Sequence, residues 1–286
     1  MLMNDRDFSL FPRMDDDSFD QLSTYVTREY GIKLPINKKS MLESRLNKKV
    51  KSLGMESYRQ FMDFIFSDEG RRRELFNVID LITTNKTDFF REPAHFQFLQ
   101  QSFLPDYLQE FGSRQLRVWS AGCSTGEEPY TLIMVLEEFR KQHSLFTYSL
   151  LASDISTRVI QVSHQGIYHK DRIAEVPVEI KRTYFLRSKK KDDNLVRVKP
   201  EFRNKITYRR INLMDNDYGM NNASLDIIFC RNVLIYFDKP IQEKVIKKFT
   251  DCLRPGALLF LGHSESLMGM NMTMKQLRPT IYQQAL

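Results

Sequence analysis

The spacing of hydrophobic residues divides the chain into two parts. From Phe19 to about Phe90, apolar positions recur at the spacing of short amphipathic helices, and no strand is obvious. In segment 38–54, Gly54 is placed to end a helix. The apolar face of that helix consists of Leu42, Leu46, Val50 and Leu53. The first part of the chain is therefore expected to be an all-helical domain.

After Pro93 the pattern changes. A linking helix is expected near 95–111, and beyond it short apolar runs alternate with helical segments. The expected strands are 116–122, 147–154, 225–232 and 257–264, and the expected helices are 128–141, 156–164 and 240–253. Such alternation predicts an α/β fold with a mostly parallel sheet that is covered on both faces. The last run, 273–286, is expected to add an edge strand.

The alternation stops between Gly166 and Tyr208. Segment 181–213 has the pattern of short strands joined by the polar turn SKKKDDN, which predicts a small antiparallel insertion. The expected organisation is an N-terminal tail (1–18), a helical domain (19–92) and a sheet domain (93–286) that carries the inserted β-subdomain (167–208).

Composition indicates an ordinary globular protein. The 286 residues are 42% hydrophobic, enough for a substantial core. No run approaches the roughly 20 apolar residues that span a bilayer, and the start lacks the features of a secretory signal, so a cytoplasmic protein without membrane insertion is expected. Cys123, Cys230 and Cys252 lie far apart without a histidine cluster, so neither a disulfide framework nor a metal site is predicted.

The net charge of +7 is unevenly distributed. Residues 1–32 hold three basic and seven acidic side chains, a net of −4, whereas residues 33–51 hold seven basic and one acidic, a net of +6. Arg45, Lys48 and Lys51 fall on the face opposite the apolar stripe of segment 38–54. This face is either a solvated helix surface or a docking face for an acidic partner.

The stretch 118-VWSAGCSTGEEPYTLIMVL-136 has the pattern of a strand, a glycine turn and a helix. Gly122 and Gly126 allow backbone to approach a ligand, but the lysine followed by Ser/Thr that would clamp nucleotide phosphates is missing. The spacing also departs from the G-x-G-x-x-G of dinucleotide sites. Glu127 would repel a pyrophosphate and suits a cationic or amino-bearing ligand. A tight turn made for packing explains the glycines equally well.

Asp154 ends the second expected strand, where a carboxylate can accept both ribose hydroxyls of an adenosine. An adenosine that carries an amine and a positive centre but no phosphate is S-adenosylmethionine. Together, the glycine turn and Asp154 favour a methyltransferase.

Five strings carry a more specific resemblance: 83-TTNKTDFFRE-92, 119-WSAGCSTGEEPY-130, 152-ASDIS-156, 229-FCRNVLIYFD-238 and 254-RPGALLFLGHSE-265. In this order they resemble the motifs of the CheR family, the chemotaxis receptor glutamate methyltransferases. The resemblance implies a Rossmann-like S-adenosylmethionine-dependent methyltransferase domain with an N-terminal all-helical domain and a small inserted antiparallel β-subdomain.

The resemblance also implies a set of cofactor contacts in addition to Gly122. They are Asn85, Thr87, Arg91, Glu127, Asp154, Asn212, Leu213, Arg231 and Asn232. Asn212 and Leu213 lie outside the matching strings and are placed by the family's asparagine after the β-subdomain.

The implied reaction methylates a receptor glutamate and leaves S-adenosylhomocysteine. A glutamate carboxylate is already ionised at neutral pH, so no general base is required. Arg91 is expected to hold the cofactor's carboxylate or the incoming glutamate, and Tyr236 to line the transfer site and orient the glutamate. A structural salt bridge and a half-buried aromatic are the alternatives for these two residues. His263 is interpreted as a structural residue and not as a catalytic one.

The expected partner is the acidic cytoplasmic helical bundle of chemotaxis receptors. Arg45, Lys48, Lys49 and Lys51 would dock it by charge. The turn SKKKDDN lacks the glycines of family members that tether to a receptor peptide. A monomer is expected.

Two other functions remain open. The pI of 9.2 suggests a nucleic-acid methyltransferase, but 231-RNVLIYF-237 stands where amino-methylating DNA enzymes carry N/D-P-P-Y/F, so no nucleic-acid partner is predicted. A non-catalytic S-adenosylmethionine-binding regulator or scaffold would share the same binding residues.

Overall fold

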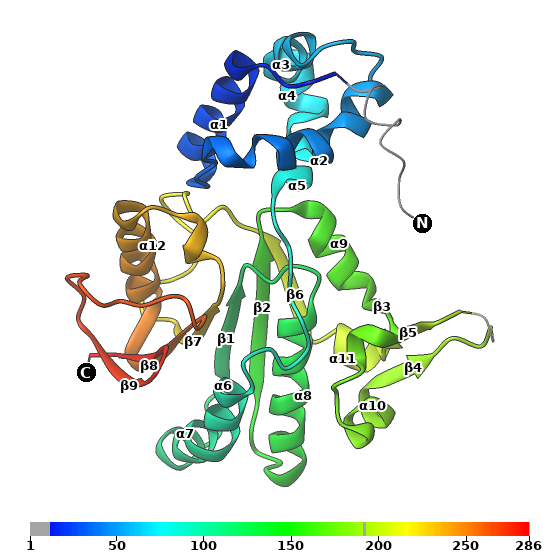
Figure 1. Cartoon of the computed structure of the whole chain (residues 1–286). Coiled ribbons are helices and arrows are strands. Elements are labelled where there is room, and N and C mark those ends of the chain that lie inside the picture. Colours follow the sequence, from blue (N-terminus) through cyan, green and yellow to red (C-terminus); the bar gives the residue numbers. More distant parts are fainter. Residues whose placement is uncertain (1–11, 191–192, 286) are drawn as a thin grey trace. The chain divides into compact units, whose positions relative to one another are not determined.

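The computed structural model describes residues 12–190 and 193–285, and these residues form two units (Figure 1). The helical unit runs through Thr84 and also takes in Tyr236–Asp238; the sheet unit comprises Asn85–Ile235 and the chain from Lys239 onward. The division at Thr84 lies eight residues before the sequence-based boundary at residue 92. Of the expected N-terminal tail, residues 1–11 lie outside the described residues.

The helical unit contains five α-helices. They are α1 (Asp16–Tyr30), α2 (Lys39–Ser52), α3 (Tyr58–Phe66), α4 (Asp68–Arg73) and α5 (Leu75–Ile82), with the 3₁₀ turn η2 (Ile36–Lys38) before α2. The Asp15 side chain caps α1 by accepting from the backbone N–H of Ser18. In α2 the predicted stripe is confirmed, because Leu42, Leu46 and Val50 are fully buried.

Seven strands form the main sheet. Their spatial order is β6 (Ile206–Arg210), β2 (Tyr148–Asp154), β1 (Leu116–Ala121), β7 (Leu225–Cys230), β8 (Leu253–Leu261), β10 (Ile281–Gln284) and β9 (Met274–Arg278). The five strands from β6 to β8 are parallel, and β10 runs antiparallel to both β8 and β9. The expected parallel sheet is confirmed, and the last run of the chain adds a hairpin of two strands where one edge strand was expected.

Aromatic side chains pack on both faces of this sheet. On one face, the Trp119 ring of β1 lies edge-on against Phe249, 5.3 Å between ring centroids. On the other, Phe229 and Phe260 stack at 4.2 Å, and Phe96 stacks on Phe229 at 5.8 Å. The helices of the sheet unit are α6 (Pro93–Phe98), α7 (Leu104–Phe111), α8 (Glu127–Gln142), α9 (Thr157–Gln165) and α12 (Lys239–Cys252), with the π-helical turn η3 (Leu99–Phe103) between α6 and α7. Because Phe249 lies on α12 and Phe96 on α6, helices cover both faces, as predicted.

A second sheet of three antiparallel strands forms the insertion. It consists of β3 (Ile167–His169), β5 (Leu195–Val198) and β4 (Phe185–Arg187), with the short helices η4 (Lys170–Ile173), α10 (Val178–Tyr184) and α11 (Pro200–Arg203) around it. Two residues of the turn SKKKDDN, Lys191 and Asp192, lie outside the described residues. The end of the expected insertion, 206–208, belongs instead to β6, which pairs with β2 in the main sheet.

Across residues 12–190 and 193–285, every helix is too short or too polar to cross a bilayer.

Candidate functional site

The glycine turn joins β1 to α8 beside the end of β2. The backbone N–H groups of Gly122 and Cys123 both donate to the Ser153 carbonyl at 2.8 Å. Gly122 has φ +83°, and a Cβ there would lie 2.4 Å from Cγ2 of Val233. Gly126 has φ +101°, and a Cβ would lie 2.2 Å from Oγ of Ser163. Both positions therefore require glycine because the turn packs closely against neighbouring side chains, which is the packing alternative that the sequence left open.

Asp154 fixes this turn against the end of β2. Its carboxylate accepts from the backbone N–H of Ser124 at 2.9 Å and from that of Ser156 at 3.0 Å, and the residue is 8% exposed. The structure thus brings Asp154 and the glycine turn together at one edge of the sheet.

Glu127 begins α8 and is almost fully buried. Its carboxylate contacts Nη2 of Arg172 at 2.5 Å and accepts from the Thr125 hydroxyl at 2.6 Å. Arg172 also reaches Asp88 at 3.0 Å, and it donates to the carbonyl of Thr87. Burial alone would lower the pKa of Arg172, but the Glu127 carboxylate raises it. The acid that the sequence singled out therefore already has a cationic partner.

The pairing with Arg172 was missed by sequence reasoning. Arg172 lies in the 3₁₀ turn η4 of the insertion, and no motif in that segment predicts a contact with α8.

The segment from Asn85 to Arg91 lies along the glycine turn. The Asn85 carbonyl accepts from the Ser124 hydroxyl at 2.9 Å, and the backbone N–H of Phe90 donates to Oγ1 of Thr131 in α8 at 3.1 Å. The Arg91 guanidinium folds back to the Lys86 carbonyl at 3.1 Å. The backbone of Asn85 is thus held by the Ser124 side chain, and the backbone of Thr87 by the Arg172 side chain.

Arg231 lies in a buried ion network. Its guanidinium contacts Glu92 at 3.1 Å and Glu128 at 3.3 Å, donates to the Arg91 carbonyl, and lies over the Phe96 ring. The Arg231 side chain is only 2% exposed. These contacts link the end of β7 to the segment before α6 and to the start of α8.

The pKa values of Glu92 and Glu128 are shifted in opposite directions. Burial raises the pKa of Glu128, although Arg231 and the Ser120 hydroxyl oppose it. Burial also acts to raise the pKa of Glu92, but there Arg231, with the backbone N–H and side chain of His263, outweighs it and the pKa falls. Arg231 thus favours the charged form of Glu92, while burial disfavours the charged form of Glu128.

Glu265 positions the residues after Arg231. Its buried carboxylate accepts backbone N–H groups from Gly262, Asn232, Val233, Leu234 and Ile235 at 2.6 to 3.3 Å. Burial raises the pKa of Glu265, and these N–H groups counteract part of the rise. Asn232 is held at φ +59°, an uncommon conformation for a residue with a side chain. Glu265 ends the last matching string, but only the structure shows this role.

Asn212 and Leu213 follow β6 at the same sheet edge as Asp154. The Ile211 N–H donates to the Asp154 carbonyl at 3.1 Å, which places the chain after β6 beside the end of β2. The Asn212 side chain accepts from the Met214 N–H at 3.0 Å, and the carbonyl of the buried Leu213 accepts from Nζ of Lys248 at 2.6 Å.

Tyr236 is a predicted site residue that groups with the helical unit. It ends the 3₁₀ turn η5 (Leu234–Tyr236), is half-buried, and belongs by its packing to the helical unit. Its carbonyl accepts from the Lys33 N–H at 2.9 Å.

The four basic residues of α2 have different environments. The Arg45 guanidinium donates to the carbonyls of Ile82 and Thr83 at 2.6 and 2.9 Å, so it caps the end of α5. Lys49 pairs with Glu74 at 2.5 Å, and both side chains are mostly buried. Lys48 and Lys51 are exposed.

All three cysteines are buried thiols. Burial, together with the nearby carboxylates of Asp154 and Glu128, raises the pKa of Cys123 well above its usual value. Burial likewise raises the pKa of Cys230, and that of Cys252 to about 11.

Comparison with known proteins matches both units to one family. Residues 85–283 match the family described as "CheR methyltransferase, SAM binding domain", and residues 17–83 match "CheR methyltransferase, all-alpha domain". The chain is 35% identical over 286 residues to the "Chemotaxis protein methyltransferase" of Borreliella burgdorferi, with 99% of each chain covered.

Two further relatives are similar over most of their length. The "Chemotaxis protein methyltransferase 2" of Pseudomonas aeruginosa is 35% identical, with 94% of this chain and 93% of the relative covered. The "Chemotaxis protein methyltransferase" of Escherichia coli is 33% identical, with 94% of this chain and 91% of the relative covered. With the two domain matches that meet near residue 84, these similarities show that the chain belongs to the CheR methyltransferase family.

Proposed function

We propose that this protein transfers a methyl group from S-adenosylmethionine to glutamate side chains of chemotaxis receptors, in the cytoplasm, forming methyl esters. The observation that carries the proposal is the glycine turn at the end of β1, held by the carboxylate at the end of β2. The names of its relatives, which are chemotaxis methyltransferases, supply the receptor as substrate.

The residues at this sheet edge fit the proposed donor. Gly122 and Gly126 let the turn pack tightly against Val233 and Ser163, which fixes the backbone of the turn beside the end of β2. The carboxylate of Asp154 suits sugar hydroxyls, and Glu127 lies at the start of α8 in its pair with Arg172. Asn85, Thr87, Arg91, Asn212 and Asn232 surround the same strand ends or lie in the matching strings, and we assign them further contacts with the donor.

When bound, the donor supplies a methyl group whose bond to sulfur breaks as an oxygen of the glutamate forms the new bond. The glutamate carboxylate is ionised at neutral pH, so no residue of this chain must remove a proton. The protein's task is to position the two groups and exclude water, which in well-oriented systems can lower a barrier by roughly 7–11 kcal/mol.

Arg91 and Tyr236 are the residues we assign to the transfer itself. A guanidinium can hold a carboxylate through two parallel N–H bonds, so Arg91 would hold a carboxylate of the donor or of the substrate. The Tyr236 hydroxyl would orient the glutamate. Arg231 would act through its neighbours, because its guanidinium is occupied by Glu92 and Glu128.

The docking surface that we propose includes only some of the basic residues of α2. Lys48 and Lys51 are exposed on the surface of α2, whereas Arg45 and Lys49 are partly buried in their contacts with α5 and Glu74. We therefore assign receptor docking mainly to Lys48 and Lys51.

The test is to incubate the protein with methyl-labelled S-adenosylmethionine and a receptor cytoplasmic fragment. We expect label that is released as methanol in base, because esters hydrolyse and methylated amines do not. The Arg91→Ala variant should lose most turnover, while Arg278→Ala, which removes an exposed arginine of β9, should retain it.

Two outcomes would contradict the proposal. Base-stable label would mean that nitrogen is methylated. Tight donor binding without label on any receptor fragment would indicate a binding protein that has no activity.

A further inference from the structure

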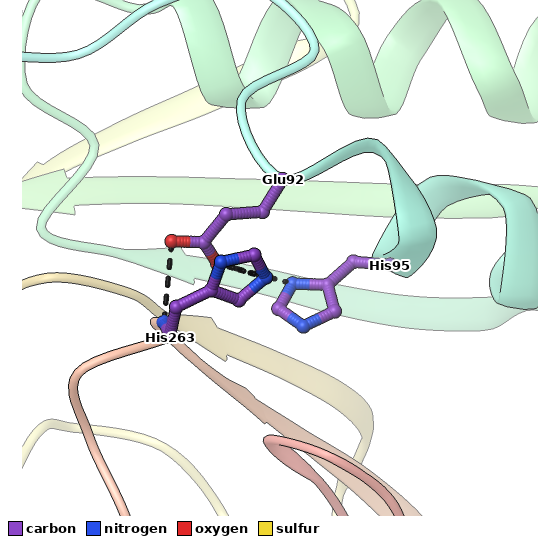
Figure 2. Close-up of side chains that lie close together, drawn as sticks. All are labelled: Glu92, His95 and His263. Atoms are coloured by element: carbon purple, nitrogen blue, oxygen red, sulfur yellow. Dashed lines mark hydrogen bonds and ion pairs between the residues drawn. The ribbon is translucent and has the colours of Figure 1, made fainter.

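Three potential metal ligands meet at the start of α6, apart from the glycine turn. Glu92 and His95 come from this helix start, and His263 follows the end of β8 (Figure 2). The Glu92 oxygen Oε2 lies 3.7 Å from Nδ1 of His95 and 3.8 Å from Nε2 of His263. All three ligand atoms lie within 4.8 Å of one another. Glu92 and His95 lie three residues apart, but His263 is distant from both in the sequence, and no metal site was predicted from it.

The hydrogen bonds of His95 determine which ring nitrogen carries its proton. Nε2 lies 2.8 Å from Oγ1 of Thr280, and the Thr280 hydroxyl donates to the Pro279 carbonyl at 2.7 Å. Since the only hydroxyl hydrogen of Thr280 is used there, its oxygen must accept a hydrogen from Nε2. Nδ1 therefore presents a lone pair.

That lone pair has no hydrogen-bond partner. His95 is 2% exposed, and its Nδ1 is a buried polar atom without a partner. It faces the Glu92 carboxylate, as Figure 2 shows. Two electron-rich atoms that face each other in a buried position leave a buried acceptor unsatisfied, which costs roughly 1–3 kcal/mol. A cation between them would satisfy the His95 nitrogen, while Glu92 would keep its contact with Arg231.

We propose that Glu92, His95 and His263 bind a divalent transition-metal ion of the zinc class. Two imidazoles and one carboxylate, with an open position for water, form a ligand set that Zn²⁺ accepts in proteins. Mg²⁺ and Ca²⁺ prefer oxygen ligands and are disfavoured by the two nitrogens.

The distances fit this ion after a small closure. Zinc–nitrogen bonds of 2.0–2.1 Å in a tetrahedron place neighbouring ligand atoms about 3.3 Å apart. The separations of 3.7 and 3.8 Å exceed this by a few tenths of an ångström. The His263 side chain is 64% exposed, so it is free to move toward the other two ligands.

The surroundings support the ligands and favour a cation. The Thr280 hydroxyl orients His95 through its second nitrogen, as outer-shell partners of metal-binding histidines do. Arg231 contacts the same Glu92 oxygen, Oε2, and also contacts Glu128, so its guanidinium is shared between two acidic side chains. The ion would join the start of α6 to the end of β8 and stabilise the folded sheet unit.

The test is a calorimetric titration of Zn²⁺ alone into metal-free protein, without receptor or donor. We expect one ion per chain in the wild type and at least about 100-fold weaker binding in His263→Ala, which removes an exposed ligand and should leave the fold intact. Thr280→Val should weaken binding about 10–100-fold, because it removes an outer-shell partner. The Co²⁺-loaded protein should show the strong visible absorption of a tetrahedral site.

The control is His169→Ala. His169 is another half-exposed histidine next to a carboxylate, with Nδ1 3.0 Å from Asp171, but it has no buried histidine beside it. Binding that is unchanged in this variant and lost in His263→Ala supports the site. Equal affinity in the wild type and His263→Ala, or no wild-type binding at micromolar Zn²⁺, would overturn it. Neither result depends on methyl transfer.

Discussion

Replacing Gly122 by alanine tests whether the close packing of Val233 against the turn requires glycine at this position. Two costs add. An alanine at φ +83° adopts a left-handed conformation that costs roughly 1–2 kcal/mol, and its Cβ, 2.4 Å from Cγ2 of Val233, forces a shift that typically costs about 1–3 kcal/mol. We expect Gly122→Ala to lower the free energy of unfolding by about 2–5 kcal/mol, measured in urea.

Two further variants separate these costs. Gly269 has nearly the same φ, +78°, and a Cβ added there would meet nothing within 4 Å, so Gly269→Ala should show the conformational cost alone. The double variant Gly122→Ala/Val233→Ala removes the colliding methyl groups and should recover about 1–2 kcal/mol relative to the sum of its single variants. Effects that add within about 0.5 kcal/mol would refute the steric argument. Calorimetry with S-adenosylhomocysteine should show weaker binding to Gly122→Ala.

Three other predictions follow from the same structure. Glu265→Gln replaces one acceptor oxygen by a donor and leaves two or three backbone N–H groups unsatisfied, so the free energy of unfolding in urea should fall by about 2–4 kcal/mol. A fall below about 0.5 kcal/mol would contradict this role. The control is Glu179→Gln, which changes an exposed glutamate. Burial acts to raise the pKa of Glu137, but hydrogen bonds from Arg140, Tyr148 and Lys205 lower it to about 2. The ionised Glu137 therefore contributes to the free energy of unfolding above pH 4.5, and this contribution is lost as the pH falls toward 2. Glu137→Gln should therefore cost about 1–3 kcal/mol at pH 7, after allowance for the half-exposed Arg140, and almost nothing near pH 2; a pH-independent cost would contradict it. Lys48→Glu and Lys51→Glu should raise the KM for a receptor fragment at low salt, with a difference that shrinks as salt rises; an unchanged KM would exclude this docking face.

The strands that the sequence predicted are those with nearly continuous apolar runs. The central strand β7 is buried at all six positions, and its sequence, LDIIFC, indicates such a strand. The edge strand β6, ITYRR, lies in a segment where short strands were expected, but it was assigned to the insertion because its mostly polar sequence does not resemble a strand of the parallel sheet. Apolar runs identify the centre of a parallel sheet better than its edge.

The candidate site was predictable where a local motif carried it. The glycine turn and Asp154 follow from strand ends that the sequence marks clearly, and the structure brings them together. The contact between Glu127 and Arg172 joins α8 to a short turn of the insertion, and nothing in either segment refers to the other. The environment of Arg45 was also hidden, because helical spacing shows which face a side chain lies on but not which carbonyl it reaches.

The buried thiol of Cys123 has a chemical consequence for a protein that would hold a sulfonium in the same turn. Sulfur anions attack alkylating agents far more readily than carboxylates do, so an ionised cysteine there would compete with the receptor for each methyl group. Because burial and two neighbouring acids keep this thiol protonated, the protein is protected from inactivating itself by self-alkylation.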